Sequence, residues 1–226
     1  MFFFDSTIIL LIPVLILAFY AQSKVKGNYQ KYSRFRNSSN LPGAEIARRI
    51  LDRQGLTDVQ VRPVKGVLTD HYDPRKRVVS LSEGVYSGVS VSSAAIAAHE
   101  VGHAIQHATK YAPLAMRASI LPVARIGTSA AFPLFILGLI MSIPSLMDIG
   151  IILFAGALLF HVVTLPVEFN ASRRAFAELN NGIIHSEQES KGVKAVLNAA
   201  ALTYIAATLM ALANLIRLIL LRGSRN

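Results

Sequence analysis

Four long runs of apolar residues set the strongest limit on how this chain can fold. None of the runs contains Asp, Glu, Lys or Arg, and the last three approach the length of about 20 residues that crosses a bilayer as a helix. A soluble domain would carry about a quarter charged residues, but this chain has 16%. The sequence therefore predicts a mainly α-helical, multi-pass membrane protein. The runs are Thr7–Ala21, Ile126–Ile143, Ile149–Val167 and Ala195–Ile216.

The first run reaches spanning length only when Phe2–Phe4 are added to it. A secretory signal peptide would begin with basic residues, whereas Asp5 precedes this run. We therefore expect residues 1–22 to form an uncleaved N-terminal membrane anchor. The stretch after the anchor is strongly basic, as a cytoplasmic flank should be. Its basic residues are Lys24, Lys26, Lys31, Arg34 and Arg36.

A net charge of +10 raises the question of a nucleic-acid partner. The densest basic cluster directly follows the anchor, where anionic lipid headgroups would attract it. No nucleic-acid-binding motif is recognisable. We therefore expect the lipid bilayer as a partner and no nucleic acid. The chain also has no cysteine, so disulfides and cysteine-based zinc clusters are excluded.

Residues 23–119 have the composition of a soluble domain with both helices and strands. Apolar spacing, turn residues and helix-capping residues place its elements. The expected elements are a helix over Ala44–Gln54 ended by Gly55, strands over Val59–Val67 and Arg77–Leu81 with a turn at His71–Pro74 between them, and an Ala-rich helix capped by Ser92 or Ser93 and ending near Ala108.

Residues 120–167 are expected to form a transmembrane hairpin, and the charges around it predict its orientation. The link Pro144–Asp148 contains no Lys or Arg. Since basic flanks remain in the cytoplasm, the link should lie outside, and residues 23–119 and a helix over 168–194 should lie inside. The flanking basic residues are Arg117, Arg125, Arg173 and Arg174.

Residues 195–226 are expected to form a C-terminal membrane helix and a basic tail. Strict alternation of spans would place the tail residues Arg217 and Arg222 outside, against the charge rule. This segment therefore either spans the membrane or lies at its interface. We favour a span.

The segment His99-Glu100-Val101-Gly102-His103 matches the His-Glu-x-x-His pattern on an expected helix. Positions four apart project from nearly the same helical face. His99 and His103 can therefore bind one Zn²⁺. Glu100 lies beside them, where its carboxylate can act as general base toward a zinc-activated water.

Two histidines need a third ligand from elsewhere in the chain. His107 lies about 12 Å along the helix from His99, too far for the same ion. The third histidine of a metzincin would stand at position 109, which is Thr109. Glu168 is the better candidate, because the expected hairpin returns the chain to the side where His103 lies. Its alternative role is an ion pair with Arg173 or Arg174.

A three-ligand site is typical of catalysis, because it leaves a position open for water. A structural zinc site would need four protein ligands, usually including Cys, and none is available. We therefore predict one Zn²⁺ ion in a small zincin-like α+β catalytic region facing the cytoplasm.

On these residues, the chain resembles the membrane-bound neutral zinc metallopeptidases of the YugP-like family and, more distantly, the HtpX and CaaX-prenyl proteases. The resemblance covers almost the whole chain, and two of its motifs are specific in combination. They are Ala-His-Glu-Val-Gly-His-Ala-Ile-Gln at Ala98–Gln106 and Glu-Phe-Asn-Ala-Ser-Arg-Arg-Ala at Glu168–Ala175.

The resemblance implies the roles of two residues in the second motif. The corresponding first Glu in the broader relatives ligates the metal, which assigns that role to Glu168. Their Asp, which steadies a ligating His, corresponds here to Ser172, whose hydroxyl could accept the same hydrogen bond without a charge. The resemblance also implies an endopeptidase with a cytoplasm-facing site that cleaves membrane or membrane-associated proteins. Between a bacterial cytoplasmic membrane and an organellar one, we favour the former.

The sequence leaves several features of the reaction open. An extended substrate could pair with an edge strand near Arg77–Leu81. His161, inside the third apolar run, is either a functional residue or a packing partner. The donor that would stabilise the oxyanion is not identified. The candidates are His71, Tyr72, Tyr86, Arg173 and Arg174.

Two other functions compete with peptide hydrolysis. The first is a zinc-bearing membrane scaffold that recruits a partner protein and cleaves nothing. The second is hydrolysis of a non-peptide bond, such as an amide in a lipid or a cell-wall precursor. Glu100 favours an enzyme over a scaffold, because a scaffold needs no base beside its metal.

Overall fold

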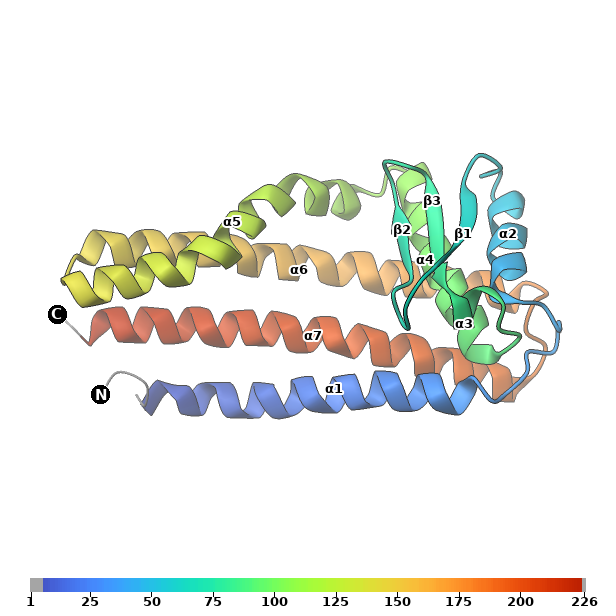
Figure 1. The fold of residues 1–226 in the computed structure, drawn as a ribbon, viewed down its shortest axis with the longest axis horizontal. Helices are drawn as coiled ribbons and strands as arrows, with labels where there is room; N and C mark the ends of the chain where they lie inside the picture. The colour runs from blue at the N-terminus through green and yellow to red at the C-terminus, as the bar shows by residue number, and fades with distance from the viewer. Residues whose placement is uncertain (1–5, 225–226) are drawn as a thin grey trace. The chain divides into compact units, whose positions relative to one another are not determined.

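The computed structural model describes residues 6–224, so the expected contribution of Phe2–Phe4 to the first span lies outside the described residues. The chain divides into two compact units. Unit 1 comprises residues 1–21, 115–166 and 203–226, and unit 2 comprises residues 22–114 and 167–202. The elements, shown in Figure 1, are η1 (Ser6–Leu10), α1 (Leu11–Tyr32), α2 (Gly43–Arg53), β1 (Gln60–Val64), β2 (His71–Asp73), β3 (Val78–Ser82), α3 (Glu83–Tyr86), α4 (Val91–Ala108), α5 (Ala112–Met141), α6 (Pro144–Asn180) and α7 (Glu187–Gly223).

Among the described residues, four helices are long and apolar enough to cross a membrane. These helices cover Thr7–Tyr32, Ala112–Met141, Pro144–Asn180 and Glu187–Gly223. The prediction of a mainly α-helical chain with four long apolar helices is confirmed. The fourth run lies within α7, one of these four helices.

Polar contacts in unit 1 join elements that are far apart in the sequence. Arg222 forms an ion pair of 2.9 Å with Asp148, near the start of α6. Arg217 Nε donates a hydrogen bond of 3.2 Å to Thr7 Oγ1. The start of the first helix, the start of α6 and the end of α7 therefore lie at one end of unit 1. Arg217 and Arg222, whose expected position outside the cell contradicts the positive-inside rule, both have polar partners at this end.

Unit 2 contains a sheet of three strands in the order β1-β3-β2. β1 pairs with β3 in parallel, and β2 pairs with β3 antiparallel. The expectation of an edge strand near Arg77–Leu81 is therefore wrong, because β3 has a partner on each side. Its position at the centre fits its burial, since Val79 and Leu81 are both fully buried.

The turn expected at His71–Pro74 is in part a strand. His71–Asp73 forms β2, and the turn follows it. The carboxylate of Asp73 accepts hydrogen bonds from the backbone N–H groups of Arg75 and Lys76, at 2.9 and 3.2 Å. The Asp73 side chain therefore stabilises a turn in the residues that follow it, which accounts for the turn-forming residues in this stretch. The residues up to Asp73 pair with β3.

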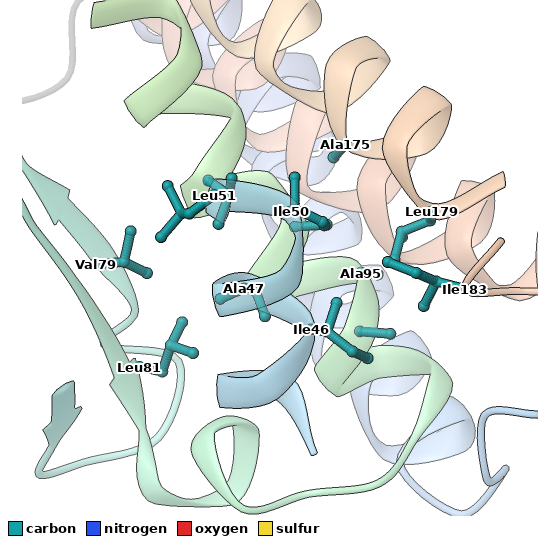
Figure 2. Close-up of a cluster of buried hydrophobic side chains, with 14 of the residues drawn as sticks. Ile46, Ala47, Ile50, Leu51, Val79, Leu81, Ala95, Ala175, Leu179 and Ile183 are labelled. Atoms are coloured by element: carbon teal, nitrogen blue, oxygen red, sulfur yellow. The ribbon is translucent and has the colours of Figure 1, made fainter. Parts of the chain in front are cut away.

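The core of unit 2 lies between the sheet, α2, α4 and the end of α6 (Figure 2). α2 buries one face completely, as its apolar spacing predicts. The helix ends where expected, with Gly55 in the left-handed region at φ 71°. Each large aliphatic side chain buried there contributes about 1.5–3 kcal/mol. Those from α2 are Ile46, Ile50 and Leu51, and those from α6 and the turn after it are Leu179 and Ile183.

α4 is buried along most of its length, and its small residues let other helices approach it. Its N-cap is Ser90, whose hydroxyl accepts a hydrogen bond of 3.1 Å from the N–H of Ser93. The cap expected at Ser92 or Ser93 is therefore displaced by two or three residues, because three serines in this short stretch carry the same capping chemistry.

α4 and α6 approach each other closely at Gly102. A Cβ atom at this position would lie 2.6 Å from the carbonyl oxygen of Ala171. The backbones of α4 and α6 are therefore in direct contact at this point. Gly in a helix interior costs about 1 kcal/mol relative to Ala, and the contact with α6 accounts for its presence.

We expect Gly102→Ala to destabilise unit 2, since the added methyl group must push α6 away. Overpacking of this kind costs about 1–3 kcal/mol, which outweighs the gain in helix propensity. Thermal unfolding of the purified protein in detergent micelles would measure the change. The matched control is Gly27→Ala in α1, where a Cβ atom meets nothing within 4 Å. If both variants unfold like the unaltered protein, the close approach at Gly102 imposes no constraint.

Candidate metal centre

Two helices of unit 2 supply the candidate site. α4 carries His99, Glu100 and His103, and the part of α6 that belongs to unit 2 carries Glu168. One helical turn separates the two imidazoles, whose ring centres lie 4.8 Å apart. Glu168 approaches both of them from α6. The structure thus brings together side chains that are far apart in the sequence.

The distances between the three side chains fit a metal ion. Glu168 Oε2 lies 3.3 Å from His99 Nε2 and 3.5 Å from His103 Nε2. Ligand atoms at about 2.0–2.1 Å from a tetrahedral Zn²⁺ would lie about 3.4 Å from one another. Among the described residues, His99, His103 and Glu168 are the one such cluster, with all ligand atoms within 4.8 Å of one another. The donor set of two imidazoles and one carboxylate suits zinc.

The charge balance of the site also favours a cation. Glu168 is only 2% exposed, and Glu100 is buried as well. Burial by itself would lower the pKa of His103, but its hydrogen bond with Glu168 and the charges of Glu100 and Glu168 outweigh burial and raise this pKa. Two buried carboxylates therefore create a negative potential at the imidazoles, and a divalent cation would neutralise it.

Each imidazole also has a partner at its other ring nitrogen. Ser172 Oγ lies 3.1 Å from Nδ1 of His99, on the α6 turn after Glu168. Nδ1 of His103 lies 3.0 Å from Oε1 of Gln106. The sequence indicated Ser172 as a candidate for this role but gave no role to Gln106. The spacing of three residues between His103 and Gln106, which places them on one helix face, was the available signal.

The remaining candidates do not join the cluster. His107 does not ligate with His99 and His103; its Nδ1 lies 2.9 Å from the hydroxyl of Tyr72 on β2. Arg174 Nε donates a hydrogen bond of 2.8 Å to Asn170. His71 bonds to the carbonyl of Thr69 on the surface. Tyr86 packs against the core of unit 2.

Comparisons with known proteins identify the family of this chain. Residues 7–223 match the protein family described as "putative neutral zinc metallopeptidase". The chain is 51% identical over 215 residues to "Putative membrane protease YugP" of Bacillus subtilis (strain 168), and the match covers 95% of each protein. No solved structure matches the chain significantly. Because both matches extend over nearly its whole length, the chain belongs to this zinc metallopeptidase family, as the resemblance of its two motifs predicted.

Proposed function

We propose that this protein is a zinc-dependent endopeptidase that hydrolyses peptide bonds in membrane or membrane-associated proteins. The observation that carries the proposal is the convergence of His99, His103 and Glu168 around one point. Glu100 follows His99 on α4, and its charge acts on His103. Three protein ligands leave one position of a tetrahedral ion open, which is the arrangement of catalytic zinc sites. We assign one Zn²⁺ to this site.

Glu100 is the residue that we assign as general base. Zn²⁺ bound by His99, His103 and Glu168 would lower the pKa of a bound water and polarise the substrate carbonyl. Glu100 follows His99 directly on α4, and its charge acts on His103. Its carboxylate would accept a proton from the attacking water and pass it to the leaving amine nitrogen.

We assign oxyanion stabilisation to Tyr72, among the candidates that the sequence offers. Its hydroxyl lies 2.9 Å from Nδ1 of His107, one helical turn after His103 on α4. Burial raises the pKa of Tyr72, so its phenol remains protonated and able to donate at neutral pH. If Nδ1 of His107 carries a proton, it donates that proton to the hydroxyl oxygen of Tyr72. The hydroxyl proton of Tyr72 can then be donated to the negative charge that develops on the substrate oxygen.

The substrate would bind in an extended conformation along a free edge of the sheet. β2 is an edge strand, and it carries Tyr72 toward α4. A peptide that pairs with β2 gains main-chain hydrogen bonds, while its side chains alternate between the two faces. β1 offers the other edge, but Pro63 removes one of its donors.

We place unit 2 on the cytoplasmic side of a bacterial cytoplasmic membrane. The basic flanks of the apolar runs support this orientation. Alternation of four spans would place the start of α6 and the end of α7 outside together. Their contact through Asp148 and Arg222 agrees with that arrangement.

One pair of variants distinguishes the role of Glu100 as general base from the role of Glu168 as third zinc ligand. Glu100→Gln should retain zinc but lose cleavage by about 10²–10⁴-fold, because an amide cannot accept the proton. Glu168→Gln should instead lose zinc, because a neutral amide oxygen is a weaker ligand than a carboxylate. Both are measured on purified protein as zinc per chain and as cleavage of unfolded membrane and soluble proteins, with and without a chelator.

The assignments of Glu100 and Glu168 can each be rejected independently of the other. Undiminished cleavage by Glu100→Gln would reject the base assignment, and full zinc occupancy in Glu168→Gln would indicate a different third ligand. An unaltered protein that binds zinc but cleaves no protein substrate would favour a scaffold or a hydrolase of another bond.

Tyr72→Phe should lower kcat by about 10²–10³-fold, the effect of removing one oxyanion donor. The zinc content should not change, because Tyr72 is not a ligand. The control is Tyr86→Phe, since Tyr86 packs against the same core. Equal activity of the two variants would exclude Tyr72 from oxyanion stabilisation.

The orientation can be tested with single cysteines, because the natural chain has none. A membrane-impermeant maleimide should label Ser145→Cys in intact cells and Lys76→Cys only after permeabilisation. Both positions are exposed, so both can react with the reagent. The reverse labelling pattern would place the candidate metal centre outside the cell.

A further inference from the structure

The side chain of Gln106 contacts both helices that carry the candidate zinc ligands. It is fully buried on α4, with 0% of its surface exposed. Its Oε1 lies 3.0 Å from Nδ1 of His103. Its Nε2 donates hydrogen bonds of 2.7 Å to the backbone carbonyl of Val167 and 3.0 Å to Oδ1 of Asn170, both on α6. Val167 is the residue directly before Glu168.

The contacts on α6 determine which way the amide of Gln106 points. A backbone carbonyl can only accept a hydrogen bond, so the amide nitrogen must face Val167. The amide oxygen must then face His103. Asn170 agrees with this orientation, since its Oδ1 also accepts a hydrogen bond of 2.8 Å from Nε of Arg174.

The orientation of Gln106 in turn determines the tautomer of His103. An amide oxygen is an acceptor only, so Nδ1 of His103 must carry the proton that it shares with Gln106. In the neutral imidazole, Nε2 then presents a lone pair. Nε2 is the atom that lies 3.5 Å from Glu168 Oε2, on the side of the candidate ion.

His99 lacks an equivalent constraint. Its Nδ1 lies 3.1 Å from the hydroxyl of Ser172, and a hydroxyl can either donate or accept. Ser172 therefore permits both tautomers of His99, whereas Gln106 permits one tautomer of His103. The two histidines are held by chemically different partners.

We propose that Gln106 is a positioning residue for the zinc site. It selects the Nε2-binding tautomer of His103 and, through Val167, holds the backbone next to Glu168. A single amide thus fixes the orientation of one ligand and the placement of another. This inference rests on the zinc site of the proposed function, and partners of this kind contribute about 10–100-fold to metal affinity.

Three variants of the full-length protein separate the contacts of Gln106. Gln106→Met keeps the length of the side chain but removes every hydrogen bond. Gln106→Glu keeps an acceptor for Nδ1 of His103 but loses the donor to Val167 and Asn170. The control Asn170→Ala removes one contact with Gln106 and leaves the bonds to His103 and Val167.

The readouts are the zinc dissociation constant, measured by competition with a chromophoric chelator, and the visible absorption spectrum of the Co²⁺-loaded protein. Gln106→Met should bind zinc about 10–100-fold more weakly than the unaltered protein and alter the Co²⁺ spectrum. Gln106→Glu should recover much of the affinity, because the tautomer of His103 is retained. Asn170→Ala should bind zinc nearly as the unaltered protein does.

A structural role alone would give a different order of affinities. If Gln106→Glu binds zinc as weakly as Gln106→Met, an acceptor for Nδ1 of His103 is not enough to maintain zinc affinity, and the selection of the tautomer by Gln106 is rejected. The same holds if Gln106→Met binds zinc normally with an unchanged Co²⁺ spectrum. If the unaltered protein binds no zinc, the proposed function itself fails, which is a separate result.

Discussion

Close packing between α4 and the end of α6 is the constraint on which the rest of unit 2 depends. Each helix contributes a pair of polar side chains one turn apart, His99 with His103 and Glu168 with Ser172. These pairs meet only if the two backbones approach closely, and Gly102 provides the space. A shift of one residue along either helix would rotate its side chains by about 100° and separate the carboxylate from the imidazoles.

The polar groups of the site are stable in an apolar core because they satisfy one another. Ala residues surround them on α4, so burial is nearly complete. An unpaired buried polar group would cost about 1–3 kcal/mol. The network of His103, Gln106, Asn170 and Arg174 instead gives the buried donors and acceptors partners on both helices. The order that the proposed metal site requires and the burial that folding requires are therefore met by the same contacts.

The chemistry of the proposed peptidase is divided among elements with different physical roles. α4 and α6 carry the proposed ligands and the proposed base, and both helices contribute buried residues to the core of unit 2. β2 lies at an edge of the sheet, where its backbone groups remain available to an extended chain. Contact between Tyr72 and His107 joins this edge to α4. A rigid ligand cluster beside an open strand is suited to binding a peptide while the reacting groups stay in place.

Local sequence patterns predicted most of the helices of this protein and the position of two candidate ligands on one of them. The four apolar runs predicted its long helices, the spacing of His99 and His103 predicted that they share one helix face, and Gly55 predicted the end of α2. The site residue Glu168 was inferred from the hairpin and from a family resemblance. The predictions of the long helices, of the shared helix face and of the end of α2 are confirmed, because these features depend on residues that are close together in the sequence. The role of Glu168 as third ligand depends on how α4 and α6 pack, and it stays a prediction.

Only the tertiary structure decided which strand lies at the edge of the sheet and which side chains hold the imidazoles. The order β1-β3-β2 places β3 at the centre of the sheet, whereas the sequence of β3 is equally compatible with an edge strand. The sequence gives no sign that Gln106 reaches Val167 or that Tyr72 reaches His107. Such contacts join residues far apart in the chain, and their geometry depends on how helices and strands pack rather than on the order of neighbouring residues.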